Sequence, residues 1–180
     1  NGVKLTYSSV YDEENDISKY ILPNLEEITS DTDDFGRTTA VHLKDADGNT
    51  LLSCTYAYVD KTVDGQVKTS EYVSSITYSN GDRYEYTYDA NGNITRYREG
   101  TVVMEYHYDE LGQIIREDNG YAKRSWTYTY DNAGNILTKT EYPYSTGMLG
   151  GSLSRIDYGY SSGNWGDQLT SYRGQTFTYD

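Results

Sequence analysis

Residues 84–97 read YEYTYDANGNITRY, and two later stretches repeat this pattern closely. They are YHYDELGQIIRE at 106–117 and YTYDNAGNILTK at 128–139. The shared order is Tyr, any residue, Tyr, Asp, two residues, Gly, one residue and then Ile. A pattern that recurs about every 20 residues is typical of an architectural unit that stacks on its own copies.

Three clear copies, at 86–97, 106–117 and 128–139, place the same residue types at equivalent positions. Their shared residues are Tyr86, Tyr88, Asp89 and Gly92; Tyr106, Tyr108, Asp109 and Gly112; and Tyr128, Tyr130, Asp131 and Gly134. A variant copy at 158–172 contains Trp165 and Gly166, and a truncated copy occupies 177–180. We therefore divide the chain into an irregular N-terminal β segment with degenerate repeats at 1–60 and a repeat array at 61–180.

Each copy has the chemistry of a β-hairpin. Tyrosines at positions i and i+2 point to the same face of a strand. The following Asp accepts hydrogen bonds from nearby backbone N–H groups and so begins a turn, which a Gly with positive φ then closes. The Ile that follows begins the next strand. The pattern predicts an all-β fold, an antiparallel meander of repeated β-hairpins.

A second set of turns is expected between the copies, at Asn80-Gly81, Glu99-Gly100 and Asn119-Gly120, because Asn-Gly is a strong hairpin signal. The glycine-rich stretch 142–152 is predicted to be a mobile loop. Arg96, Arg116 and Lys139 follow the copies at similar positions, so we expect cation–π contacts between them and tyrosine rings.

Composition restricts the function classes. The formal net charge of -13 disfavours binding to nucleic acid, whose phosphates an acidic surface repels. Tyrosine, with 22 copies, supplies large rings for packing in a chain of low mean hydropathy. The lone Cys54 forms no internal disulfide and is predicted to be a buried strand residue.

The sequence contains no recognised catalytic or metal-binding motif, so we expect no catalytic residue, no cofactor and no metal site. The Asp45–Asn49 segment resembles the start of a calcium loop, but the position of the bidentate acidic ligand holds Tyr56. Neither His42 nor His107 has metal-ligand spacing. The motif aspartates are better explained as turn residues than as catalytic acids. We expect the chain to be non-enzymatic.

Trp126 and Trp165 admit two interpretations. They pack within the sheet and over a hairpin, or they form an exposed aromatic platform that binds carbohydrate. A carbohydrate-binding module or surface adhesin is therefore the alternative function.

The stretches YTYDANGNIT, YHYDELGQII and YTYDNAGNIL closely resemble the YD repeat of the rearrangement-hotspot (RHS) family. That family includes bacterial polymorphic toxins, wall-associated proteins, the C components of Tc toxins and the animal teneurins. The resemblance implies a long β-sheet that curves into a shell or spiral, of which this chain is a fragment. The shell encloses a C-terminal effector in toxins and supports adhesion in teneurins.

The resemblance makes this chain a structural block of a longer bacterial protein that is secreted or displayed at the cell surface or wall. Its partners would be the neighbouring repeats of the same protein and an encapsulated C-terminal effector. A carbohydrate or cell-surface partner belongs to the alternative function. Because open strand edges invite pairing, we expect the chain either to self-associate through these edges or to protect them with residues 1–60.

Overall fold

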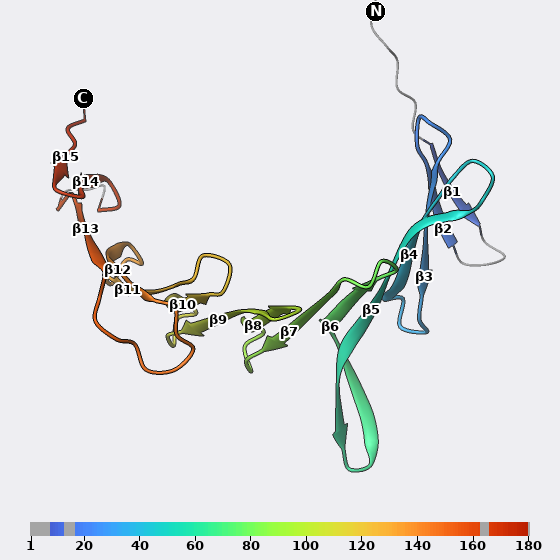
Figure 1. Cartoon of the computed structure of the whole chain (residues 1–180), viewed down its shortest axis with the longest axis horizontal. Helices are drawn as coiled ribbons and strands as arrows, with labels where there is room; N and C mark the ends of the chain where they lie inside the picture. The colour runs from blue at the N-terminus through green and yellow to red at the C-terminus, as the bar shows by residue number, and fades with distance from the viewer. Residues whose placement is uncertain (1–7, 13–16, 163–165, 180) are drawn as a thin grey trace, which may run out of the picture. The chain divides into compact units, whose positions relative to one another are not determined.

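The computed structural model describes residues 8–12, 17–162 and 166–179, and their regular elements are all β-strands. The hydrogen-bonded order of the strands follows their order along the chain, from β1 to β15, and neighbours pair antiparallel (Figure 1). This confirms the predicted all-β meander. Among the described residues there is no helix of the length and apolar character needed to cross a membrane.

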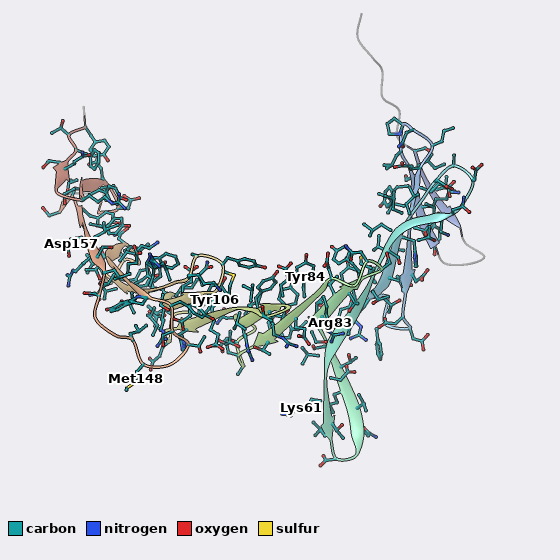
Figure 2. All side chains as sticks on the ribbon, in the orientation of Figure 1. Lys61, Arg83, Tyr84, Tyr106, Met148 and Asp157 are labelled. Atoms are coloured by element: carbon teal, nitrogen blue, oxygen red, sulfur yellow. The ribbon has the colours of Figure 1, made fainter. Side chains whose placement is uncertain are left out.

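Contacts divide the chain into two compact units, residues 1–86 and 87–180. The first contains β1 (Ser8–Asp12), β2 (Ile17–Ile21), β3 (Glu27–Thr32), β4 (Thr38–Lys44), β5 (Thr50–Val63), β6 (Gln66–Tyr78) and most of β7 (Arg83–Tyr88). In this unit, β5 and β6 form a long hairpin with Lys61 near its tip (Figures 1 and 2). This division follows contacts within the fold, whereas the predicted boundary at 60/61 follows sequence repeats. The repeat array at 61–180 therefore stays a prediction.

The second unit continues the meander with shorter strands. These are β8 (Ile94–Glu99), β9 (Val102–Tyr108), β10 (Ile114–Asn119), β11 (Arg124–Tyr130), β12 (Ile136–Pro143), β13 (Ser154–Tyr160), β14 (Leu169–Tyr172) and β15 (Gln175–Thr176). The clear motif copies lie at the hairpins β7–β8, β9–β10 and β11–β12.

The sheet has little conventional core. Among the described residues, Ala40 and Cys54 are the buried apolar side chains, so the prediction of a buried Cys54 is confirmed. About half of the other described residues are half-buried, because directly opposed residues on neighbouring strands cover one another, and most of the rest are exposed. Cross-strand packing on the two faces therefore takes the place of a deep core.

The chain reverses at Asn119-Gly120 as predicted, but not with the conformation of an Asn-Gly hairpin turn. Gly120 does not have positive φ; the left-handed residue of this turn is Lys123, with φ of 54°. Gly120 instead donates from its N–H to the Val103 carbonyl at 2.9 Å, and an added Cβ would lie 2.4 Å from that oxygen. Glycine is required here by close backbone contact rather than by turn conformation.

The segment after β12 is attached to the sheet by hydrogen bonds, although its glycines predict a mobile loop. Tyr144 donates its hydroxyl to the Val103 carbonyl at 3.1 Å. The Ser145 N–H donates to the Ser125 hydroxyl at 3.0 Å, and the Arg116 guanidinium donates to the Ser145 carbonyl at 2.6 Å. Met148, at the tip of this segment, is 95% exposed (Figure 2).

Candidate functional site: the tyrosine face of the repeats

Each motif Asp organises a hairpin turn through its backbone and its carboxylate. The Asp131 Oδ1 accepts hydrogen bonds from the N–H groups of Ala133 and Asn135, both at 2.9 Å. Its Oδ2 accepts from the Asn135 side-chain amide at 2.9 Å. The Gly134 N–H donates to the Asp131 carbonyl at 3.1 Å, with φ of 87° at Gly134. Carboxylate, backbone and glycine together fix the turn.

The same carboxylate-to-backbone arrangement recurs at Asp33, Asp45, Asp89 and Asp109. Hydrogen bonds from Asn93 and Asn135 side chains to Asp89 and Asp131 are the chief cause that lowers the pKa of both carboxyls below 3.8. A carboxylate that already accepts several hydrogen bonds in a turn is a poor proton donor near neutral pH. This chemistry suits a structural part rather than a general acid.

A second recurring contact joins one hairpin to the next, and we call it the tyrosine latch. The hydroxyl of the second motif tyrosine donates to the carbonyl of the residue two positions after the glycine of the preceding copy. Tyr108 donates to Ile94 at 2.8 Å, and Tyr130 donates to Ile114 at 2.7 Å. Tyr160 donates to Ile136 at 3.1 Å. Each latch satisfies a carbonyl beside a turn and connects two repeats.

The latch also occurs where the sequence repeat is degenerate. Tyr58 donates to the Thr38 carbonyl at 2.6 Å, two residues after Gly36. Tyr179, in the truncated copy, makes a similar contact: it donates to the Leu169 carbonyl at 2.7 Å, three residues rather than two after Gly166. Because the acceptor is a backbone carbonyl, the latch does not depend on which side chain follows the glycine.

In the second unit, the first tyrosines of two copies, Tyr106 and Tyr128, lie on one face of the sheet, which we call the tyrosine face. Glu117 on β10 is directly opposite both Tyr106 on β9 and Trp126 on β11. The Tyr128 hydroxyl donates to the Glu117 carboxylate at 3.1 Å. Burial and the Glu117 charge raise the pKa of Tyr128, and burial is the largest cause that raises the pKa of Tyr106. These phenols are held in the neutral form.

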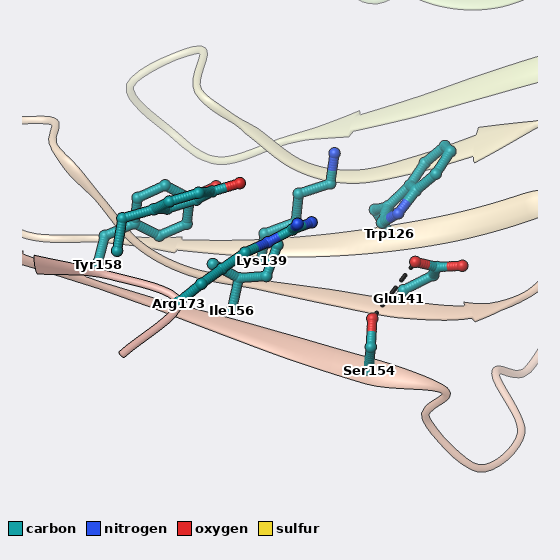
Figure 3. Close-up of a pocket in the computed structure, with 8 residues that line it drawn as sticks. Trp126, Lys139, Glu141, Ser154, Ile156, Tyr158 and Arg173 are labelled. Carbon is teal, nitrogen blue, oxygen red and sulfur yellow. Dashed lines mark hydrogen bonds between the residues drawn. The ribbon is translucent and has the colours of Figure 1, made fainter. Parts of the chain in front are cut away.

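A hollow of about 280 Å³ opens on the tyrosine face of the second unit (Figure 3). The Lys139 ammonium lies 4.6 Å from the centre of the Trp126 ring and 5.4 Å from that of Tyr128. Glu141 accepts a hydrogen bond from Ser154 at 3.3 Å. The hollow is also lined by Ile156, Tyr158, Tyr172 and Arg173. Aromatic rings and charges of both signs thus share one shallow surface.

The expected cation–π contacts are found for Lys139 alone of the three basic residues. Arg96 and Arg116 lie on the opposite side of the sheet, which we call the polar face. Arg96 pairs with Glu105, with 3.5 Å between Nε and Oε1, and Arg116 Nε lies 3.0 Å from Asp118 Oδ1. The strand alternation sends them away from the rings, because Arg96 is directly opposite Glu105 rather than a motif tyrosine.

The two predicted platform residues, Trp126 and Trp165, have different outcomes. Trp126 lies in β11 and lines the hollow, where it contacts Lys139. Trp165 lies outside the described residues. Gly166 is exposed, and its carbonyl accepts a hydrogen bond from the Asn135 side chain at 3.2 Å, so the variant copy contacts the preceding turn. Glu141 and Arg173, which also line the hollow, have no motif that could have identified them.

The family model of the RHS repeat matches residues 108–146. The match covers this segment and not the rest of the chain. The resemblance noted from the tyrosine motif is thereby confirmed over 108–146. Among curated proteins, no relative matches the sequence.

Solved structures with a similar arrangement include the TcdB2-TccC3-Cdc42 complex, with 15% identity, a TM-score of 0.49, and coverage of 88% of this chain and 10% of that one. The Tc holotoxin pore of Photorhabdus luminescens has 15% identity, a TM-score of 0.46, and coverage of 86% and 10%. A porin-like protein from Bacteroides uniformis has 17% identity, a TM-score of 0.42, and coverage of 84% and 74%. The chain spans about a tenth of the length of the toxin chains.

The segment 108–146, which matches the RHS repeat, contains the geometry described above. Within it lie the Asp109 and Asp131 turns, the latch from Tyr130 to Ile114, and Tyr144, which attaches the following segment to Val103. The matched segment therefore coincides with the hairpins that these hydrogen bonds hold.

Proposed function

We propose that the chain is a scaffold segment, part of the wall of a shell made of RHS repeats, and has no enzymatic activity of its own. The observation that supports this best is the tyrosine latch, which joins successive hairpins at Tyr108, Tyr130 and Tyr160. A unit whose hydrogen bonds are completed by its neighbour is suited to building a continuous wall.

The wall belongs to a bacterial protein that is secreted or displayed at the cell surface, and it encloses a toxic effector or supports contact between cells. The match to the RHS repeat at 108–146 supports this proposal, because the family that the tyrosine motif resembles includes toxins and wall-associated proteins. In the organism that makes it, protease added to intact cells should degrade a surface-displayed form, while a secreted form should appear in the medium. Retention of the protein inside intact cells, protected from protease, would contradict this setting.

The enclosing role can be tested through the reactivity of tyrosines. In a shell, the tyrosine face would line the interior, so Tyr106 and Tyr128 should resist nitration by tetranitromethane in the protein as the bacterium makes it. The same residues should react faster in the isolated chain. Equal reactivity of Tyr106 in both forms would contradict an enclosed face.

A carbohydrate-binding role is the second candidate, and the hollow beside Trp126 favours it. Sugar rings stack on aromatic faces, and the charged groups of Lys139, Glu141 and Arg173 offer hydrogen bonds beside that ring. Titration with cell-wall glycans should shift the fluorescence of Trp126, and Trp126→Ala should abolish binding. No response in the wild-type chain to any such glycan would remove this candidate.

A further inference from the structure

Three potential metal ligands meet on the polar face of the second unit, although the sequence spacing does not indicate a site. Glu105 and His107 lie two residues apart on β9 and so point to the same face. Asp118 on β10 is directly opposite Glu105. One ligand atom from each of the three side chains lies within 4.8 Å of those of the other two. Only the strand register brings residue 118 beside residues 105 and 107.

Asp118 supplies the observation that points to a ligand. Its side chain is completely buried, and Oδ1 accepts a hydrogen bond from Arg116 Nε at 3.0 Å. Its Oδ2 is buried without a hydrogen-bond partner among the described residues, and it lies 3.9 Å from His107 Nε2. A buried carboxylate oxygen without a partner is unfavourable, and natural structures rarely leave one without a bound ion or water.

We propose that Glu105, His107 and Asp118 bind one divalent transition-metal ion, for which Zn²⁺ is the best-matched species. One imidazole and two carboxylates suit Zn²⁺ and its first-row neighbours, whereas Ca²⁺ and Mg²⁺ prefer oxygen ligands alone. The two carboxylates balance the charge of the ion. A water molecule would complete a four-coordinate site.

The partly exposed side chains allow an ion to enter the site and the ligands to close around it. The His107 side chain is 49% exposed and that of Glu105 is 25% exposed, so an ion approaches from the side of the imidazole. Ligand atoms around Zn²⁺ lie about 3.3 Å apart when each is about 2.0–2.1 Å from the metal. Rotation of the His107 and Glu105 side chains that moves their ligand atoms by about 1 Å toward the buried Asp118 would give this spacing.

Two arginines beside the ligands lower the affinity of the site for a metal ion. Arg96 holds Glu105, with 3.5 Å between Nε and Oε1, and Arg116 holds Asp118. Both positive charges oppose a cation, and Arg96 must release Glu105 before it ligates. Arg96, whose side chain is 47% exposed, is the replaceable competitor, whereas Arg116 also holds the segment after β12.

The experiment is calorimetric titration of ZnCl₂ into the tag-free, chelator-treated chain, with CaCl₂ as the comparison ion. We expect one Zn²⁺ per chain and much weaker Ca²⁺ binding. His107→Gln should weaken Zn²⁺ binding by at least about tenfold. His42→Gln is the matched control, because His42 Nε2 lies 3.1 Å from Asp31 Oδ2 but belongs to no three-ligand group among the described residues. It should bind Zn²⁺ like the wild type.

Arg96→Gln separates a metal site from a purely structural ion pair, because only a metal site predicts a change in Zn²⁺ affinity. Removal of the competing charge should tighten Zn²⁺ binding several-fold, and Co²⁺ in place of Zn²⁺ should give a visible absorption band that His107→Gln loses. Because both residues are half-exposed, neither change should alter the far-ultraviolet circular dichroism of the chain. Equal Zn²⁺ affinity in the wild type and His107→Gln, or weaker binding in Arg96→Gln, would overturn the proposal.

Discussion

The two compact units use the same latch with different sequences around it. In the second unit the acceptors are Ile94, Ile114 and Ile136, at the conserved position of clear motif copies. In the first unit, Tyr58 reaches the carbonyl of Thr38, where the motif is hardly recognisable. The difference shows that the repeat is defined by a backbone acceptor and a tyrosine donor. The intervening side chains can change as long as the hairpin geometry is kept.

The units differ in what their glycines do. In the first unit Gly36, Gly48, Gly65 and Gly81 all have positive φ, and a Cβ at any of them would meet open space. In the second unit Gly120 has ordinary φ but contacts the Val103 backbone closely. Substitutions should therefore separate a unit held by turns from one that also depends on close contact between strands and turns.

The largest difference between the units is expected at alkaline pH. Burial is the main cause that raises the pKa of the second-unit phenols Tyr106, Tyr108, Tyr128, Tyr130, Tyr144, Tyr158 and Tyr160 above 10.0. In the first unit, the pKa of Tyr56 is raised to about 12, chiefly by its contact with Cys54, and that of Tyr86 is raised by burial.

As pH rises past 10, unfolded tyrosines ionise before folded ones, so the stability from these phenols is complete below pH 10 and is lost as pH climbs through the raised values. The second unit should therefore unfold first. Absorbance of tyrosinate near 295 nm, combined with hydrogen exchange in each unit, measures this. Simple ionisation of all tyrosines near pH 10 with the sheet intact would contradict it.

Gly120→Ala should cost about 3 kcal/mol of unfolding free energy, because the new methyl group overlaps the Val103 carbonyl and disrupts the bond to it. Gly36→Ala is the control in the other unit and should cost about 1 kcal/mol from its positive φ alone. Urea unfolding followed by Trp126 fluorescence reports the second unit, and hydrogen exchange reports the first. Equal effects at the two glycines would show that Gly120 has no special contact.

Tyr130→Phe should destabilise the second unit by about 1 kcal/mol, because the Ile114 carbonyl loses its donor while the ring stays in place. Tyr58→Phe should have a similar effect on the first unit, through Thr38. Tyr20, which is 55% exposed, is the control, and Tyr20→Phe should change stability by less than about 0.5 kcal/mol. If Tyr58→Phe had no effect while Tyr130→Phe did, the equivalence of the two units would fail.

The smallest effect is expected at acid pH and should be alike in the two units. Side-chain hydrogen bonds are the main cause that lowers the pKa of Asp33, Asp45, Asp89 and Asp131 below 3.8. Their contribution to stability is complete above pH 3.8 and is lost as pH falls through the lowered values. The midpoint urea concentration of unfolding should fall from pH 5 to pH 2. The double substitution of Asp45→Asn and Asp131→Asn should make this fall smaller. A larger acid loss in one unit would contradict the similarity of the turns.

The sequence predicts the hairpins well because their signals are local. Asp131 and Gly134 lie three residues apart, so the turn chemistry can be read directly from the order of residues. The special role of Gly120 could not be read this way, because Val103 is the second partner and lies in another strand. The same reason explains the incorrect expectation for Arg116, whose partners are Asp118 and the segment after β12.

The candidate sites were harder to predict than the hairpins. Trp126 could be proposed as a platform residue, but Lys139 and Glu141 join it only through the pairing of β11 with β12. His107 was assigned no ligand role because sequence spacing alone places Asp118 too far away. Strand register, which a single sequence specifies weakly beyond each turn, decides both sites.

Hydrogen exchange in Tyr130→Phe tests the central claim, that each repeat is stabilised by a latch from the next one. Loss of the Tyr130 hydroxyl should speed exchange in β10 of the preceding hairpin (Ile114–Asn119), in addition to any change within Tyr130's own strand. Tyr20→Phe should leave the exchange of β10 unchanged. Faster exchange confined to β11 and β12, with β10 protected as in the wild type, would contradict the account.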